Sequence, residues 1–544
     1  MASTWYYASP ERPRLWRVTL AWLYRYWEPL TVAGLTALTL WMYLFRRHLT
    51  PDVHTDEYNY YRAGYNIWRF GSNAWPESGP ITVHPPIYFL CEALLFSLVR
   101  TDVEGMYQGV YTARILNAIF ATITALLVYL LARKLGGKRM AFLAMGVYML
   151  DPFILRTNRR GMLETLTELW VVIAFLFFYL WHTHFTFRRQ IALGVVMGLS
   201  LLTKELAIVS LVALYPFIAL LPVNPLPARQ ALRHPLWRWV FVYWHDFKGI
   251  FSEKFALLKG LTLSFLVGLL MWTAFPIWAF SVGNGQRFLE TKFSLLLRWS
   301  GKVQTTGWNR PGVSFLDPLL NNLRQYATSY ILLGVGGLIT LWLFFANRDT
   351  ATRFLLAWAA SLYATFAFVI VAGQNNDQYF YLLIIPSLLV VTYALERFMR
   401  QQKRMSPRWR WPVTIVVSVL CASFFAYNAY DWVHVYGVGV DNARWQLTQW
   451  VNDNIPPGET IGVGIRVTAY VQAMFPHNRV VTVINERQTR QMGIRYVVTG
   501  SKWLAYRFGD FEPSYYQWIE DYGKPLFSVY GPTAWRLTVY YLNY

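Results

Sequence analysis

The chain has 544 residues, of which 55% are hydrophobic and only 15% are charged, and this composition excludes an ordinary soluble globular protein. The apolar residues form blocks of about 20, the length at which a helix crosses a bilayer. The formal charge of +21 comes largely from Lys and Arg residues that flank these blocks. Since no basic tract has the spacing of a nucleic-acid motif, the charge indicates membrane lipids as partners and not nucleic acid.

The N-terminal region is basic as far as Arg25 and is followed by the apolar run 30–45. Arg46 and Arg47 come next, with no small-residue cleavage site, so we predict a retained signal anchor. Cys91 and Cys421 both lie in apolar surroundings. This pair predicts neither a disulfide framework nor a thiolate metal site.

Eleven membrane spans are predicted. They are placed at about 29–47, 111–132, 139–155, 162–181, 190–203, 206–221, 261–280, 327–346, 353–372, 378–395 and 412–431. A cytoplasmic N-terminus puts every short loop that is rich in Lys and Arg on the cytoplasmic side of an inner membrane, and the C-terminus outside. The spans 190–203 and 206–221 are too short to cross straight through, so Lys204 between them is expected below the outer surface.

Three regions are expected outside the membrane on the far face. The loop 48–110 contains a predicted helix from near Asp56 and an amphipathic one from about Pro86 to Val99. The loop 281–326 is polar and basic, and the tail from Asp441 alternates helical with strand-like patterns. Its strands are predicted at Thr460–Val463, Val480–Ile484, Tyr496–Thr499, Leu526–Tyr530 and Leu537–Tyr541. The predicted fold is thus a polytopic α-helical membrane protein, with a catalytic domain over 1–440 and a small extracytoplasmic α/β domain over 441–544.

Four charged positions stand out as candidates for chemistry. Asp56 and Glu57 open the first outer helix, where acids also complement the helix dipole behind a Thr55 cap. We interpret one carboxylate as a general base and the other as its structural or metal-holding partner. Glu164, with Glu168 one turn further on, lies inside a predicted span, where a carboxylate indicates function or an ion pair with a nearby arginine such as Arg160.

Cations at the outer ends of spans are candidates for holding a phosphate. Arg114 either reaches the headgroups or grips a phosphate with two nitrogens, and Lys204 has the same alternatives, with Glu205 as a neutralising neighbour. His84 precedes a Pro-Pro corner and either shapes the loop or contacts a metal or phosphate. The remaining candidates for a substrate cavity are Tyr60, Arg160, Arg298, Lys302, Asp377 and Tyr379.

The order of these segments resembles one known superfamily. The acidic pair in the first outer loop is followed by TARILNAIFATITALLVYLLARKLGGKR, LDPFILRTNRRGMLETLTEL, GLSLLTKELA and DQYFYLLIIPSLLVV. Over nearly the whole chain this is similar to the GT-C polyprenyl-phosphate-sugar-dependent glycosyltransferases, in particular the protein O-mannosyltransferase and aminoarabinose-transferase branch. Each motif is loose alone, and the specificity comes from their order.

The resemblance implies roles for individual residues. Asp56 would be the catalytic base or its metal-holding equivalent with Glu57 beside it, Glu164 the second acid, and Arg114 and Lys204 the groups near the lipid phosphate. Aminoarabinose transferases have an acid and a Lys before the Pro-Pro corner where this chain has Val83 and His84. A divalent metal ion held by Asp56 and Glu164 therefore stays an open alternative to no cofactor. The Trp-Trp-Asp acceptor signature of oligosaccharyltransferases is absent, which argues against transfer of a whole glycan.

The predicted reaction is the inverting transfer of one sugar from a polyprenyl-phosphate donor to a hydroxyl on a lipid, glycan or protein. The donor already carries a good leaving group, so one base and cations for the departing phosphate are sufficient. A transporter or flippase for lipid-linked sugars is the main alternative, but it predicts matching broken helices in two halves, and only one short pair is present. A non-catalytic relative is a second alternative, which the retained acids and cations disfavour.

Overall fold

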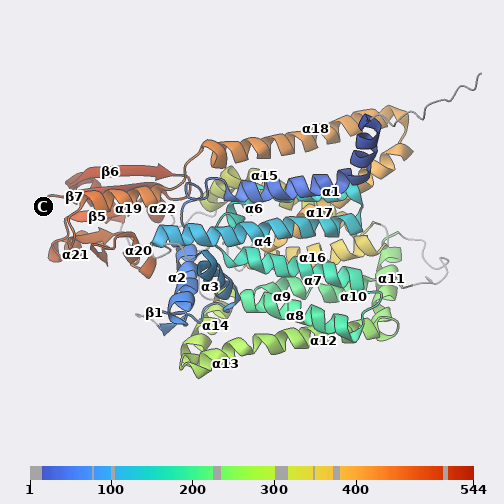
Figure 1. The fold of residues 1–544 in the computed structure, drawn as a ribbon, viewed down its shortest axis with the longest axis horizontal. Coiled ribbons are helices and arrows are strands. Elements are labelled where there is room, and N and C mark those ends of the chain that lie inside the picture. Colours follow the sequence, from blue (N-terminus) through green and yellow to red (C-terminus); the bar gives the residue numbers. More distant parts are fainter. Residues whose placement is uncertain are drawn as a thin grey trace, which may run out of the picture.

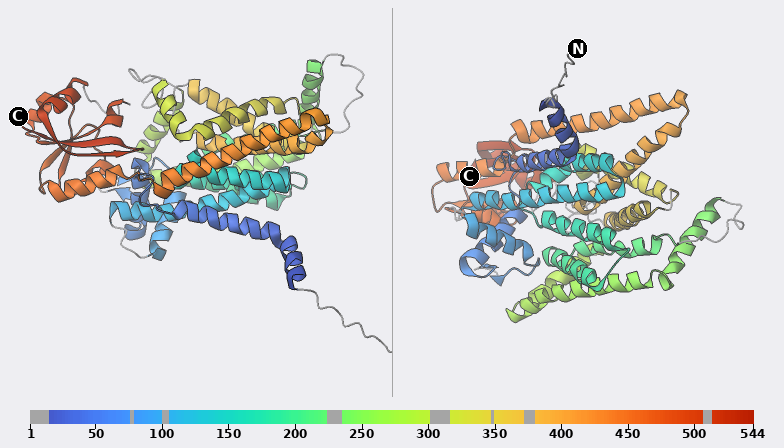
Figure 2. Two further views of the ribbon diagram at one scale, coloured as in Figure 1. Left: turned by 90° about the horizontal axis from the view of Figure 1, so that it is seen from above. Right: turned by 45° about the vertical axis from the view of Figure 1, so that its right-hand side comes forward.

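The computed structural model describes residues 15–75, 79–99, 105–223, 235–300, 316–346, 349–371, 380–505 and 513–544. Long helices run side by side, with a β-sheet beyond one end of the bundle and α11 at the other (Figures 1 and 2). Within the described ranges, seven helices are long and apolar enough to cross a membrane, or eight if one bent pair counts as a span. The chain is therefore built as an integral membrane protein.

The long helices follow the predicted spans closely. They are α1 (Leu15–Leu44), α4 (Met106–Leu135), α7 (Leu163–Trp181), α8 (Phe187–Thr203), α12 (Phe255–Trp272), α15 (Leu316–Leu343), α16 (Thr350–Val371), α17 (Tyr381–Gln401) and α18 (Pro407–Trp432). Shorter helices join or extend them: α9 (Ala207–Leu211), α10 (Leu214–Leu220), α11 (Pro235–Lys248) and α13 (Ala274–Ser281). The predicted break after Thr203 is confirmed, because α8 ends there and α9 starts three residues after Lys204.

The prediction of one straight helical span at 139–155 is wrong. It consists of α5 (Lys138–Leu150) and α6 (Pro152–Asn158), which meet at 62°. Pro152 has no N–H to continue α5, and the Asp151 carboxylate accepts hydrogen bonds from the N–H groups of Phe153 and Ile154. The sequence Asp-Pro thus ends one helix and caps the next.

Three helices gather at the sheet end of the bundle. They are α2 (Thr55–Phe70), α3 (Ile87–Val99) and α14 (Gly285–Trp299), and α2 packs closely along α3 (Figure 1). The first two confirm the helices predicted for the first outer loop, whose short hairpin consists of β1 (Ala74–Trp75) and β2 (Gly79–Pro80). The helix α14 was not predicted, because its Gly and Asn neighbours read as loop.

The C-terminal part contains a five-stranded sheet in the order β4-β3-β5-β7-β6. Its strands are β3 (Thr460–Val463), β4 (Arg479–Thr482), β5 (Tyr496–Gly500), β6 (Gly523–Gly531) and β7 (Trp535–Leu542), and its helices are α19 (Ala443–Asn454), α20 (Ala469–Met474), α21 (Glu486–Gln491), α22 (Ser501–Ala505) and α23 (Pro513–Tyr522). The strands β3, β4 and β5 pair in parallel, and β7 pairs antiparallel with β5 and β6. All five predicted strands are confirmed in position.

The C-terminal sheet shares one apolar core with the outer loop. Tyr58 and Tyr61 of α2 belong to the same cluster of buried side chains as Val498 and Leu537 of the sheet. A polar contact fixes the same junction, since Asp441 accepts hydrogen bonds from the N–H groups of Thr533 and Asp52. The start of α2 is therefore held between the helix bundle and the sheet.

Candidate active site

The first turn of α2 positions the two predicted acids. His54 caps the helix, because its Nδ1 accepts a hydrogen bond from the N–H of Asp56 at 3.2 Å. The Glu57 carboxylate returns the contact by accepting the N–H of His54 at 2.8 Å, which completes a capping box. The cap predicted at Thr55 is therefore one residue late, and Asp56 lies in a turn whose backbone is fixed on both sides.

Glu57 and Arg114 form a fully buried ion pair. Nε and one terminal nitrogen of Arg114 donate to the two Glu57 oxygens at 2.9 and 3.0 Å, and the third nitrogen donates to the Arg47 carbonyl. Glu57 also accepts the N–H of Gly161 at 2.8 Å. Since these groups are fully engaged with each other and the backbone, the geometry gives them a positioning role. It differs from the roles predicted for Glu57 in catalysis and for Arg114 in holding the phosphate.

The side chain of Asp56 is much more exposed than that of Glu57. The Asp56 side chain is 35% exposed and lies 3.7 Å from the His54 ring nitrogen. Burial, then the charges of Asp56 and Glu164, raise the pKa of the Tyr60 hydroxyl well above its usual value. Asp56 and Glu164 therefore both lie within electrostatic range of the same buried tyrosine, although they are far apart in the sequence.

Glu164 and Lys204 meet in an ion pair of 2.5 Å between the start of α7 and the end of α8. Both are largely buried, at 4% and 12% exposed. The prediction that Glu205 neutralises Lys204 is wrong, because Glu205 pairs at 2.6 Å with Lys292 of α14. Lys292 was missed, although it lies on the polar face of a helical pattern in the second outer loop.

His84 lies beside these two lysines. Its Nε2 is 3.4 Å from the Tyr60 hydroxyl, and Lys292 donates a hydrogen bond to the neighbouring Val83 carbonyl at 3.0 Å. Burial, then the charges of Lys204 and Lys292, lower the pKa of His84 well below its usual value. A neutral histidine and two lysines thus line the side of the site that faces α8 and α14.

This arrangement predicts how stability depends on pH. Because the pKa of His84 is depressed in the folded state, the unfolded chain binds an extra proton as pH falls through about 6.5, and acid favours unfolding by at most about 1.4 kcal/mol per pH unit. Between pH 7.5 and 5.5 the melting temperature should fall more steeply for wild type than for His84→Asn. The measurement is a thermal melt of both proteins in lipid nanodiscs at several pH values. Parallel pH profiles would contradict the prediction.

Three arginines act electrostatically on the His54 cap at the start of α2. Burial is the main cause that lowers the pKa of His54, and Arg160 is the strongest of the charges that add to it, followed by Arg444 and Arg156. Arg159, by contrast, donates to the carbonyls of α1 and the following turn, and is structural. Arg160 and Arg156 therefore lie within electrostatic range of the His54 cap, and the place predicted for Arg160 in a substrate cavity stays a prediction.

Several predicted positions lie beyond what the structure describes. Lys302, Asp377 and Tyr379 are outside the described residues, as is the side chain of Arg298, so their proposed place in a cavity stays a prediction. Among the residues described, no three His, Cys, Asp or Glu side chains form a group suited to a metal ion. Glu164 faces a lysine, so the described donors do not fit a metal shared with Asp56.

Comparisons with known proteins define the class to which this fold belongs. Residues 83–244 match the model of the dolichyl-phosphate-mannose-protein mannosyltransferase family. The oligosaccharyltransferase AglB of Archaeoglobus fulgidus superposes with a TM-score of 0.55 at 15% identity, over 95% of this chain and 74% of that one. ArnT of Cupriavidus metallidurans gives 0.53 at 13% identity, over 94% and 97% of the two chains.

The chain therefore has the fold of the GT-C glycosyltransferases, and the predicted resemblance is confirmed. No curated protein sequence matches it.

Proposed function

We propose that this protein is an inverting glycosyltransferase that moves one sugar from a polyprenyl-phosphate donor to a hydroxyl acceptor on the outer face of the membrane. The proposal is carried by the Glu164–Lys204 ion pair, the His84 ring 3.4 Å from the Tyr60 hydroxyl, and the partly exposed Asp56 on the same helix as Tyr60, at the end of a bundle with the GT-C fold. A partly exposed carboxylate and nearby cations are the groups that this transfer needs.

The difference in exposure among the acids assigns their roles in the proposed reaction. Asp56, which is the more accessible acid, takes the proton of the acceptor hydroxyl as that oxygen attacks the anomeric carbon. The bond from that carbon to the phosphate oxygen breaks, and polyprenyl phosphate leaves toward the cations. The attacking and leaving groups lie on opposite faces of the sugar, so the configuration inverts. Glu57 and Arg114 keep Asp56 in place and do not touch the sugar.

Structures of the fold relatives are consistent with such a donor. One AglB structure is a complex with an inhibitory peptide and a dolichol-phosphate, and one ArnT structure is bound to undecaprenyl phosphate. From the eleven apolar blocks and the Lys- and Arg-rich short loops of the sequence, we propose eleven spans, a cytoplasmic N-terminus in an inner membrane, and a C-terminal domain on the outer side. A divalent metal at Asp56 and Glu164 would have to displace Lys204 from Glu164, so we propose that Lys204 supplies the positive charge there.

Lys204 is expected to contribute directly to donor affinity. Lys204→Ala should weaken binding of an undecaprenyl-phosphate sugar by roughly 10-fold or more, because one charge-assisted contact to phosphate is lost. Lys204→Arg should retain part of the affinity, and Lys524→Ala, which removes an exposed lysine on β6, should change nothing. Donor affinity in nanodiscs, measured by thermophoresis, checks this. An unchanged donor affinity of Lys204→Ala would contradict the proposed contact between Lys204 and the donor phosphate.

The function is tested by incubating the purified protein with a panel of radiolabelled polyprenyl-phosphate sugars and an extract of membrane acceptors. We expect one donor to transfer label, with the anomeric configuration of the product opposite to that of the donor. Release of the label from the lipid without an acceptor product, or movement of the intact donor across a vesicle membrane, would contradict the proposal.

A further inference from the structure

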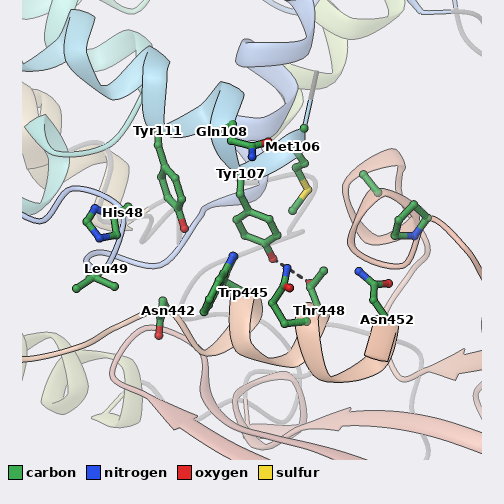
Figure 3. Close-up of a pocket in the computed structure, with 14 residues that line it drawn as sticks. His48, Leu49, Met106, Tyr107, Gln108, Tyr111, Asn442, Trp445, Thr448 and Asn452 are labelled. Atoms are coloured by element: carbon green, nitrogen blue, oxygen red, sulfur yellow. Dashed lines mark hydrogen bonds between the residues drawn. The ribbon is translucent and has the colours of Figure 1, made fainter. Parts of the chain in front are cut away.

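A pocket of approximately 430 Å³ lies between the N-terminal end of α4 and the helix α19, and it shares no lining residue with the candidate active site (Figure 3). One wall carries Tyr107 and Tyr111 of α4, and the other carries Trp445 and Thr448 of α19. His48 and Leu49 close one side. Its volume is in the range of small-ligand sites.

The walls of this pocket are held in place independently of any ligand. The hydroxyls of Tyr107 and Thr448 join α4 to α19 at 3.0 Å across it (Figure 3). Next to Trp445, the N–H of Arg444 donates to the Asp52 carboxylate at 3.1 Å and so ties the start of α19 to the outer loop. The cavity is therefore a fixed feature of the junction between the bundle and the sheet.

The lining chemistry is neutral, aromatic and rich in amides. It includes Gln108, Asn442, Gln449 and Asn452, and none of the fourteen lining residues is an Asp, Glu, Lys or Arg. The lining also includes His48, whose pKa is lowered by partial burial and by Arg47 and Arg46, so it is uncharged at neutral pH. An anionic ligand would find no cation among the lining residues, and a purely apolar one would leave amide groups unpaired.

Trp445 is the residue in the pocket best placed to meet a ligand. The residue is 37% exposed and, within the part of the chain described, its indole makes neither a ring contact nor a hydrogen bond. Trp450, on the same helix, instead stacks on Phe527 with ring centroids 5.2 Å apart. The Oδ1 atom of Asn452 also accepts no hydrogen bond. An unpartnered indole beside an amide oxygen without a partner matches a molecule with one apolar face and hydroxyl edges.

We propose that this pocket binds a neutral sugar unit, with the apolar face of the pyranose ring on Trp445 and its hydroxyls on the surrounding amides. The site is separate from Asp56 and Lys204, and it needs no transfer reaction. A saccharide held there by the outer end of α4 would be anchored on the same face of the protein as the candidate active site.

The test is saturation-transfer-difference NMR on the full-length protein in lipid nanodiscs, since a maltoside detergent would itself supply a sugar. Mannotriose is the neutral probe, trigalacturonic acid the charged one, and a tetrapeptide of Ala and Ser the peptide one. We expect mannotriose alone to bind, in the millimolar range, with affinity roughly tenfold weaker for Trp445→Ala through loss of one aromatic contact. Tyr530→Ala, which removes an exposed aromatic ring on β6, should bind as wild type does.

Asp56→Asn should also retain mannotriose binding, which separates this site from the proposed transfer. Equal affinity of wild type and Trp445→Ala would overturn the proposal, as would the absence of mannotriose binding. Preferential binding of trigalacturonic acid, or Trp445-dependent binding of the peptide in place of the sugar, would overturn it as well. Gln449→Ala gives a milder second variant, for which we expect a smaller loss of mannotriose affinity.

Discussion

Asp56→Asn is expected to reduce sugar transfer by roughly 10²- to 10⁴-fold, the usual contribution of a general base. The amide keeps the size of the carboxylate and its place beside His54, but it cannot take a proton from the acceptor hydroxyl. Because the side chain is 35% exposed and the capping contacts use backbone atoms of this turn, the fold should be unaffected. The measurement is the rate of label transfer at saturating donor.

Two further measurements sharpen this prediction. Donor affinity should change little in Asp56→Asn, because the phosphate contacts lie on the Lys204 side, so the loss should fall on kcat and not on donor binding. Asp521→Asn changes an exposed carboxylate on α23 in the same way and should transfer at the wild-type rate. Full turnover by Asp56→Asn would remove the proposed base.

Glu57→Gln should have the largest effect on stability. It leaves the Arg114 guanidinium charged and buried without its carboxylate, and breaking such a pair from one side costs about 3–5 kcal/mol. The N–H groups of His54 and Gly161 bind different oxygens of the Glu57 carboxylate, so the single amide oxygen of the new side chain can accept only one of them, and the loss includes one backbone contact besides the charge. We expect a markedly lower melting temperature in nanodiscs and a lower yield of folded protein.

A double variant and a surface pair provide the controls. Glu57→Gln combined with Arg114→Met removes both charges and should recover part of the stability, since no unpaired charge remains buried. Glu486→Gln breaks the pair with Arg490, which is 2.7 Å long but has both side chains more than 40% exposed, and should cost at most about 1 kcal/mol. Equal effects of Glu57→Gln and Glu486→Gln would contradict the structural role of the Glu57–Arg114 pair.

Helices and strands were largely predictable from the sequence because each depends on local pattern. Apolar blocks and strand-like runs gave α4, α7, β3 and β5 within a few residues. The break at Asp151 and Pro152 was missed, since the apolar pattern continues through it and only the capping chemistry interrupts the helix. The helix α14 was missed for the opposite reason, because Gly and Asn flank a segment whose helical periodicity is good.

The pairing of charged side chains was the part that sequence could not supply. Residue types and positions pointed to Asp56, Glu164 and Lys204. Several pairings are possible, however, because the lysines (Lys204 and Lys292) and the acids (Asp56, Glu164 and Glu205) come from different segments of the chain. Only the packing of α2, α7, α8 and α14 places Glu164 on Lys204 and Glu205 on Lys292. Likewise, nothing local distinguishes Glu57 from Asp56, and the buried Arg114 decides which of the two stays accessible.

The central claim is that Asp56 and Lys204 face one bound donor from opposite sides. It is tested most directly by a structure of the protein with an undecaprenyl-phosphate sugar, in the Asp56→Asn form that cannot turn over. We predict that a phosphate oxygen lies within about 4 Å of the Lys204 Nζ, and that the face of the anomeric carbon away from the phosphate opens toward residue 56. A phosphate held elsewhere, with residue 56 out of reach of the sugar, would contradict the account.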